Sequence, residues 1–211
     1  FSLMTPNGIS GGPDNAIYVS NAGTATFPQD AIFRTADLDN DGAASSPGEI
    51  TVFADFASVA NSSPFGISYA TGGAPTVPPA FFVADLRGSS ADVIFRVRDI
   101  DNNGTVDPAE IVEFYVDGTF MAPASFTAVA DSAGSIYVHE STSSVAPQTV
   151  YRLTDLDDSG TINSSSEAVE VWNEGDLTPL AGAMSNSFDI SVGADASAHA
   201  RLAISSNGGD P

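Results

Sequence analysis

One short pattern occurs three times in this chain of 211 residues, and it constrains the fold more than any other feature. An aromatic residue and an arginine precede an acidic loop in "AIFRTADLDNDGAASSPGEITVFAD", in "VIFRVRDIDNNGTVDPAEIVEFYVD" and in "TVYRLTDLDDSGTINSSSEAVEVWNE". The first loop aspartates are Asp37, Asp99 and Asp155, which lie 62 and 56 residues apart. A period of this length indicates an array of similar structural units.

Short apolar runs rich in β-branched and aromatic residues precede each acidic loop. "NAIYVSN", "AFFVADL" and "SIYVHES" occupy corresponding positions, and "NGIS", "FGIS" and "FTAVA" come before them. A fourth run, "FDISV", begins at Phe188 and is followed by "ARLAISS". Clusters of Gly, Pro, Ser and Asn separate the runs, and helical periodicity is absent. The sequence therefore predicts four short strands per unit, in the first unit near residues 7–10, 16–20, 31–36 and 50–54.

Four antiparallel strands per unit are typical of the blades of a β-propeller, here with the acidic loop inserted between the third and fourth strands. We therefore expect an all-β fold, one domain over residues 1–211 with about 3.5 blades. The predicted bounds are about 5–55, 63–117 and 124–174 for three blades, and 186–211 for a partial fourth. A β-sandwich array and a β-helix are the alternatives. Because 3.5 blades cannot close a ring, we expect the remainder of a longer propeller or another protein to complete it.

Composition restricts the partners of the chain. The formal charge is −21, from 27 carboxylates against six arginines and no lysine. Such a surface repels nucleic acid and anionic lipid, so cations are the expected counter-charge. With 42% hydrophobic residues the chain can bury a core, and no apolar run approaches the ~20 residues that span a membrane. The absence of cysteine excludes disulfides and thiolate metal sites, and the acidity and lack of lysine favour a secreted, cell-surface or periplasmic bacterial protein.

The three acidic loops match the pattern of a 12-residue calcium loop, in which residues 1, 3, 5, 7 and 12 supply oxygens and residue 6 is glycine. The match is complete in the middle loop, while in the other two the closing glutamate falls at position 13. The candidate ligands are, in the first loop, Asp37, Asp39, Asp41, the carbonyl of Ala43 and Glu49; in the second, Asp99, Asp101, Asn103, the carbonyl of Thr105, Asp107 and Glu110; and in the third, Asp155, Asp157, Ser159, the carbonyl of Thr161 and Glu167.

Alternating spacing turns these oxygens inward around one ion, and a calcium ion takes six to eight oxygens at ~2.3–2.6 Å. Without a cation the clustered carboxylates repel one another. Strings of Asp, Asn and Gly are also ordinary turn formers, but three matches at the same point of a repeat favour metal binding. Ser159 is a neutral ligand, which makes the third site the weakest of the three.

The loops resemble EF-hand and dockerin calcium loops over about 12 residues each, but their flanks favour strands where an EF-hand has helices. Taken whole, the chain resembles bacterial extracellular β-propellers of the NHL or SMP-30 type with EF-hand-like insertions. The resemblance implies up to three bound Ca²⁺ ions.

Catalytic motifs are absent. His139 and Glu140 are the one histidine and carboxylate that adjoin, yet neighbours on a strand point to opposite faces. We expect His139 and His199 to be surface or satisfied polar residues, and the arginines before the loops, Arg34, Arg96 and Arg152, to hold a loop carboxylate or a strand carbonyl. The sequence thus favours a non-enzymatic calcium-binding module with a structural, adhesive or complex-forming role. A calcium-dependent hydrolase, a phytase-like phosphatase or a lactonase, is the competing hypothesis.

Overall fold

The computed structural model describes residues 6–23, 30–71, 78–87, 91–119, 125–131, 134–141, 149–173, 187–194 and 200–206. Within these ranges the chain is all-β, with one short 3₁₀ turn, η1, at Pro108–Glu110. The strands are β1 Pro6–Gly11, β2 Ile17–Asn21, β3 Ala31–Thr35, β4 Ile50–Asp55, β5 Pro64–Ala70, β6 Ala80–Asp85, β7 Val93–Val97, β8 Ile111–Val116, β9 Ser125–Ala130, β10 Ile136–Ser141, β11 Thr149–Leu153, β12 Ala168–Asn173, β13 Ser187–Ala194 and β14 Ala200–Ser206.

The strands form three four-stranded antiparallel sheets and one strand pair. Each sheet follows chain order: β1 to β4, which we name unit 1; β5 to β8, unit 2; and β9 to β12, unit 3. β13 pairs with β14. The four strands predicted for unit 1 are confirmed, with ends that differ by one residue at most. No helix in the described parts of the chain is both long and apolar enough to cross a membrane.

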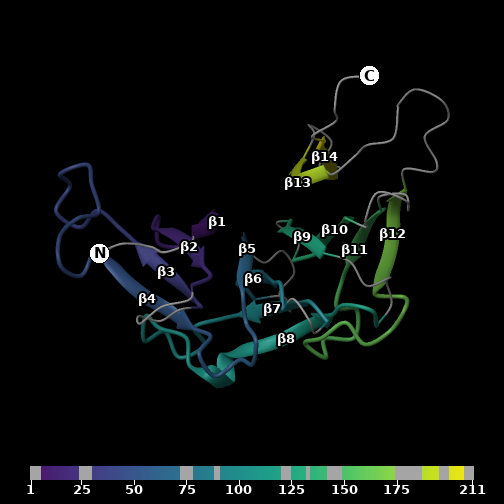
Figure 1. Cartoon of the computed structure of the whole chain (residues 1–211), viewed down its shortest axis with the longest axis horizontal. Helices are drawn as coiled ribbons and strands as arrows, with labels where there is room; N and C mark the ends of the chain where they lie inside the picture. The colour runs from purple at the N-terminus through teal and green to yellow at the C-terminus, as the bar shows by residue number, and fades with distance from the viewer. Residues whose placement is uncertain are drawn as a thin grey trace.

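The units stand side by side along an arc (Figure 1). Contacts join the first strands of successive units, β1 to β5 and β5 to β9, and β9 also contacts β13. The fourth strands β4, β8 and β12 lie on the outer side of the arc (Figure 1). The described residues form an open arc, in which no sheet closes on itself.

A β-bulge interrupts the pairing of the third and fourth strands in every unit. The register shifts between Ile32 and Phe33, between Ile94 and Phe95, and between Val150 and Tyr151. The extra residue on the fourth strand is therefore Phe53 in unit 1, Phe114 in unit 2 and Val171 in unit 3. The extra residue of a bulge is unpaired in the ladder, so its backbone groups are left for other partners.

The hydrophobic core lies between the units. At the first junction, Tyr18 and Phe53 of unit 1 pack on Phe81 of unit 2, with ring centroids 4.4 Å and 5.5 Å from that of Phe81. At the second junction, Phe82 and Phe114 of unit 2 belong to one cluster with residues of unit 3. An isolated sheet would leave such a face in water, so each unit depends on its neighbour for burial.

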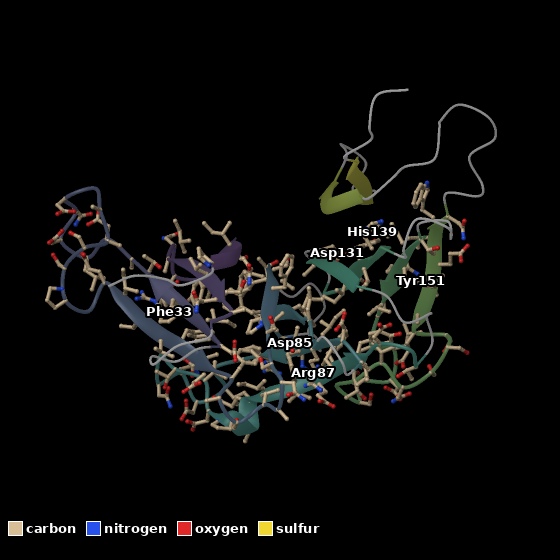
Figure 2. The ribbon with its side chains drawn as sticks, viewed as in Figure 1. Phe33, Asp85, Arg87, Asp131, His139 and Tyr151 are labelled. Atoms are coloured by element: carbon tan, nitrogen blue, oxygen red, sulfur yellow. The ribbon has the colours of Figure 1, made fainter. Side chains whose placement is uncertain are left out.

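A buried ion pair lies at the end of β6 (Figure 2). Asp85 is fully buried, and its Oδ1 is 3.5 Å from Nε of Arg87. Ser62 Oγ donates to Asp85 Oδ2 at 2.6 Å, and Arg87 also pairs with Glu113 at 3.1 Å. Burial raises the pKa of Asp85, and the hydrogen bonds from Ser62 and Ser63 oppose that rise. Arg87 thereby links the last residue of β6 to Glu113 of β8.

Candidate metal centre

The three acidic loops connect the third and fourth strands, as the sequence predicts, and have left-handed residues at the same two positions of their first halves. The fourth loop residue has positive φ in each case: 59° at Asn40, 58° at Asn102 and 56° at Asp158. The sixth residue, glycine in every loop, has φ of 89° or 90°. Asn and Asp tolerate the left-handed region better than other residues with a side chain, and glycine adopts it freely. These local preferences explain why the first halves of the loops coil in the same way.

Backbone amides hold the first aspartate of each loop in place. Oδ1 of Asp37, Asp99 and Asp155 accepts from the amide of the fifth residue, at 3.1, 3.0 and 3.0 Å. Their Oδ2 atoms accept from the glycine amide, at 2.9, 2.9 and 2.8 Å. The aspartate at position 3, which is Asp39, Asp101 or Asp157, accepts from the same fifth-residue amide at 3.0–3.2 Å. The first and third carboxylates therefore converge on the inside of the loop.

The closing glutamate completes each cluster despite the extra residue in the first and third loops. Glu49 accepts from the amides of Leu38 at 2.9 Å and Ser45 at 2.8 Å. Glu167 accepts from Leu156 at 2.8 Å and Asn163 at 2.9 Å. Glu49 and Glu167 are 1% and 2% exposed. A glutamate at position 13 thus reaches the place that position 12 occupies in the second loop.

Three carboxylate triads result, in each of which one oxygen per residue lies within 4.8 Å of the others. The triads are Asp37, Asp39 and Glu49; Asp99, Asp101 and Glu110; and Asp155, Asp157 and Glu167. They are the groups of three or more metal-ligating side chains that come together among the described residues. Each triad could hold a metal ion.

The other predicted ligands lie in the same loops but outside the triads. Oδ1 of Asp41 accepts from the Ala43 amide and Oδ1 of Asn103 from the Thr105 amide, both at 2.8 Å. Ser159 Oγ donates to the carbonyl of Thr161 at 3.0 Å. The side chain of Asp107 is exposed, while its amide donates to Glu110 Oε2 at 2.8 Å.

Two further loop residues, which the calcium-loop pattern does not predict, donate hydrogen bonds to the triads. Ser46 Oγ donates to Asp39 Oδ2, and Asn163 Nδ2 donates to Asp157 Oδ2, both at 3.0 Å. Both residues follow the loop glycine and precede the closing glutamate, where small polar side chains can reach back to the third aspartate. Ser46 lies three residues before Glu49 and Asn163 four residues before Glu167, so no fixed spacing in the sequence identifies them.

Hydrogen bonding keeps several of the clustered carboxylates ionised. The Asn163 amide, followed by the Ser159 hydroxyl, lowers the pKa of Asp157 to about 2. Backbone amides of Ser46 and Leu38 lower the pKa of Glu49. Burial raises the pKa of Asp155, and the amides of Gly160 and Ser159 oppose that rise. Ionised oxygens in close proximity and no nitrogen or sulfur donor are the ligand set that hard cations such as calcium prefer.

The lowered pKa of Asp157 predicts that the metal-free protein loses stability in a defined range of acid pH. The folded pKa of Asp157 lies below its ordinary value of 3.8, so its stabilising contribution is complete above pH 3.8 and is lost as pH falls toward 2. Replacing Asp157 by Asn should flatten this part of the pH dependence of the unfolding free energy, measured by urea unfolding of protein freed of metal by chelator and dialysis at neutral pH. Equal slopes for wild type and Asp157→Asn would contradict the assignment.

The arginines before the loops do not share one role. Arg96 Nη1 lies 3.8 Å from Oδ2 of Asp155, so it approaches a loop carboxylate of the next unit, and its guanidinium packs against Gly160. Arg34 Nε instead donates to Asp14 Oδ2 at 2.6 Å, in the turn between β1 and β2. The expectation of a loop carboxylate or strand carbonyl as partner is therefore wrong for Arg34. Arg152 is exposed on β11.

His139 lies on β10 with 1% exposure and has partners in the structure, so it is the satisfied polar residue of the two expected alternatives. The predicted residue His199 lies outside the described residues.

A comparison with known proteins identifies no relative: the chain matches no known protein family, and no curated protein is significantly similar to it.

Proposed function

We propose that this chain is a calcium-binding segment of an extracellular β-propeller, related in kind to the NHL and SMP-30 propellers, with a structural, adhesive or complex-forming role. The observation that carries the proposal is the same carboxylate triad in three loops, each with its oxygens within 4.8 Å. The order of strands in the three sheets and their placement along an arc support the propeller. The remainder of a longer propeller or another protein is the proposed partner.

Calcium fits the triads for three reasons. Their donors are carboxylate oxygens, which suit a hard cation. Two aspartates and a glutamate leave a net negative charge that a divalent ion neutralises. The residues at positions 5 and 7, among them Asp41, Asn103 and the carbonyl of Thr161, lie in the same loops and can add oxygens toward the six to eight that calcium takes. A bound ion would supply positive charge to each loop, while the chain itself orients the oxygens through its amides.

Calcium titration of chelator-treated protein by calorimetry tests the proposal. We expect three bound ions in the wild-type protein. Each of the variants Glu49→Gln, Glu110→Gln and Glu167→Gln should lose one of them, because a neutral amide at the closing position removes a charged ligand. Glu170→Gln serves as a control, since Glu170 is an exposed residue of β12 outside the loops. An absence of binding in the wild-type protein would refute the proposal.

A cavity beside the second loop is the observation that supports a second candidate function, that of a calcium-dependent hydrolase. The cavity measures about 510 Å³ and is lined by Tyr18, Arg34, Phe53, Arg98 and Asp99, among others. Arginine and a nearby cation are the groups that a phosphate ester or a lactone substrate would need. Arg34, however, already pairs with Asp14, which reduces its capacity to bind an anion. Turnover of phosphate esters or lactones that requires calcium would favour the hydrolase over the binding module.

Arg96 should weaken ion binding at the third loop. Its guanidinium lies 3.8 Å from Asp155, so its charge repels a cation held by that triad. We expect Arg96→Gln to raise the calcium affinity of the third site roughly tenfold, because repulsion between one unit charge and a nearby divalent ion is on the order of 1 kcal/mol even in a water-like dielectric. Arg34→Gln is the matched control and should leave the calcium affinity unchanged, because Asp14 neutralises the charge of Arg34. A lower affinity in Arg96→Gln would mean that Arg96 orients Asp155 rather than opposing the ion.

A further inference from the structure

The second and third loops each contact the unit that precedes them. The amide of Val106, the eighth residue of the second loop, donates to the carbonyl of Phe53 at 2.7 Å, and Val106 forms a parallel bridge with Ala54. The amide of Ile162, the eighth residue of the third loop, donates to the carbonyl of Phe114 at 2.8 Å. Phe53 and Phe114 are the bulged residues of β4 and β8, so the ladder leaves their carbonyls free to accept these bonds.

The side chains of the two eighth residues extend the same contact. Val106 is 7% exposed and belongs to the cluster between units 1 and 2 with Phe53 and Tyr18. Ile162 is 6% exposed and belongs to the cluster between units 2 and 3 with Phe114. Each loop therefore inserts an apolar residue into a junction while its backbone pairs with the outer strand of the neighbouring unit.

The next residue along each loop connects this contact to the acidic triad. Val106 directly precedes Asp107, whose amide donates to Oε2 of Glu110 at 2.8 Å. Ile162 directly precedes Asn163, whose amide donates to Oε2 of Glu167 at 2.9 Å. The closing glutamate and the junction thus hold adjacent residues of one short segment. These bonds connect the closing glutamate, through one adjacent residue, to the residue that contacts the neighbouring unit.

We propose that the second and third loops are ion-dependent clamps between units, an inference that rests on the proposed calcium binding. An ion in the second loop fixes unit 2 to unit 1, and an ion in the third loop fixes unit 3 to unit 2. Without the ion, repulsion among the three carboxylates loosens the loop and the eighth residue leaves the junction more often. By linkage, docking of the units raises the ion affinity of the same loops.

The first loop provides a control within the same molecule. Its eighth residue is Ala44, which is half-buried and smaller than Val106 or Ile162. Ala44 makes no backbone hydrogen bond to another unit within the described ranges. An ion in the first loop should therefore order that loop without changing a junction.

Hydrogen exchange followed by NMR tests the clamp on the whole 211-residue chain, with calcium alone as the probe. We expect calcium to slow exchange of the Val106 and Ile162 amides at least tenfold. In calcium, Glu110→Gln should lose protection at Val106 and keep it at Ile162, Glu167→Gln should do the reverse, and Glu49→Gln should keep both. Loss of protection at both amides in either single variant would indicate general loosening of the structure and would contradict the clamp.

Calorimetry on the same samples separates the two proposals. If calcium does not bind, the proposed function fails. If calcium binds but protection of the Val106 and Ile162 amides in the wild-type protein does not change, the clamp fails and calcium binding stands. Where a variant does not fold, the wild-type comparison with and without calcium still refutes the clamp if protection of these two amides does not change.

Discussion

Removal of calcium is expected to lower the melting temperature of this chain by about 15–30 °C. A site that is occupied at ~100 times its dissociation constant stabilises the folded state by about 2.7 kcal/mol, so three independent sites contribute about 8 kcal/mol. For a chain of this size, each kcal/mol shifts the midpoint by about 2–4 °C. The unfolded chain has no preformed sites, so most of the binding free energy appears as stability.

Differential scanning calorimetry with calcium and then with excess chelator measures this shift. The control is a chain that carries Glu49→Gln, Glu110→Gln and Glu167→Gln together, whose midpoint should not respond to chelator. An identical midpoint for the wild-type protein in calcium and in chelator would refute the proposed stabilising role of the ion.

The second large effect is expected from Phe53→Ala, which should lower the free energy of unfolding by about 3–5 kcal/mol. Phe53 is 6% exposed, and its ring lies edge-on to Tyr18 at 4.9 Å and to Phe81 at 5.5 Å, measured between ring centroids. Its truncation leaves a cavity at the junction of units 1 and 2, since the rigid sheets on either side cannot collapse into it.

Urea unfolding in saturating calcium measures the loss for Phe53→Ala. Leu38→Ala is a suitable control, because Leu38 is a loop residue with 60% exposure, and its truncation should change the unfolding free energy by about 0.5 kcal/mol or less. If Phe53→Ala lowered the free energy of unfolding as little as Leu38→Ala does, the junction would not be a packed core.

The features that could be predicted from sequence are those set by local interactions. The strands of unit 1 follow from short apolar runs rich in β-branched and aromatic residues between turn formers, both of which act over a few residues. The triads follow from spacing, because the amides that orient Asp37 come from the residues four and five positions further on. Glu49 and Glu167 also accept from the amides of Ser46 and Ser164, and spacing alone does not reveal that a glutamate at position 13 reaches the triad.

The features that escaped prediction depend on contacts between distant parts of the chain. Arg34 and Arg96 occupy equivalent places in the pattern, yet Asp14 binds one and the third loop contacts the other. The docking of Val106 on Phe53 joins residues more than 50 positions apart, and no local pattern encodes it. Such outcomes are decided by tertiary packing, on which a single sequence gives little information.

X-ray diffraction from crystals grown at millimolar calcium can locate the ions in the three loops. We expect an anomalous difference peak inside each loop, bounded by the triads of Asp37, Asp39 and Glu49, of Asp99, Asp101 and Glu110, and of Asp155, Asp157 and Glu167. Loops without such peaks at that calcium concentration would contradict the proposed calcium binding.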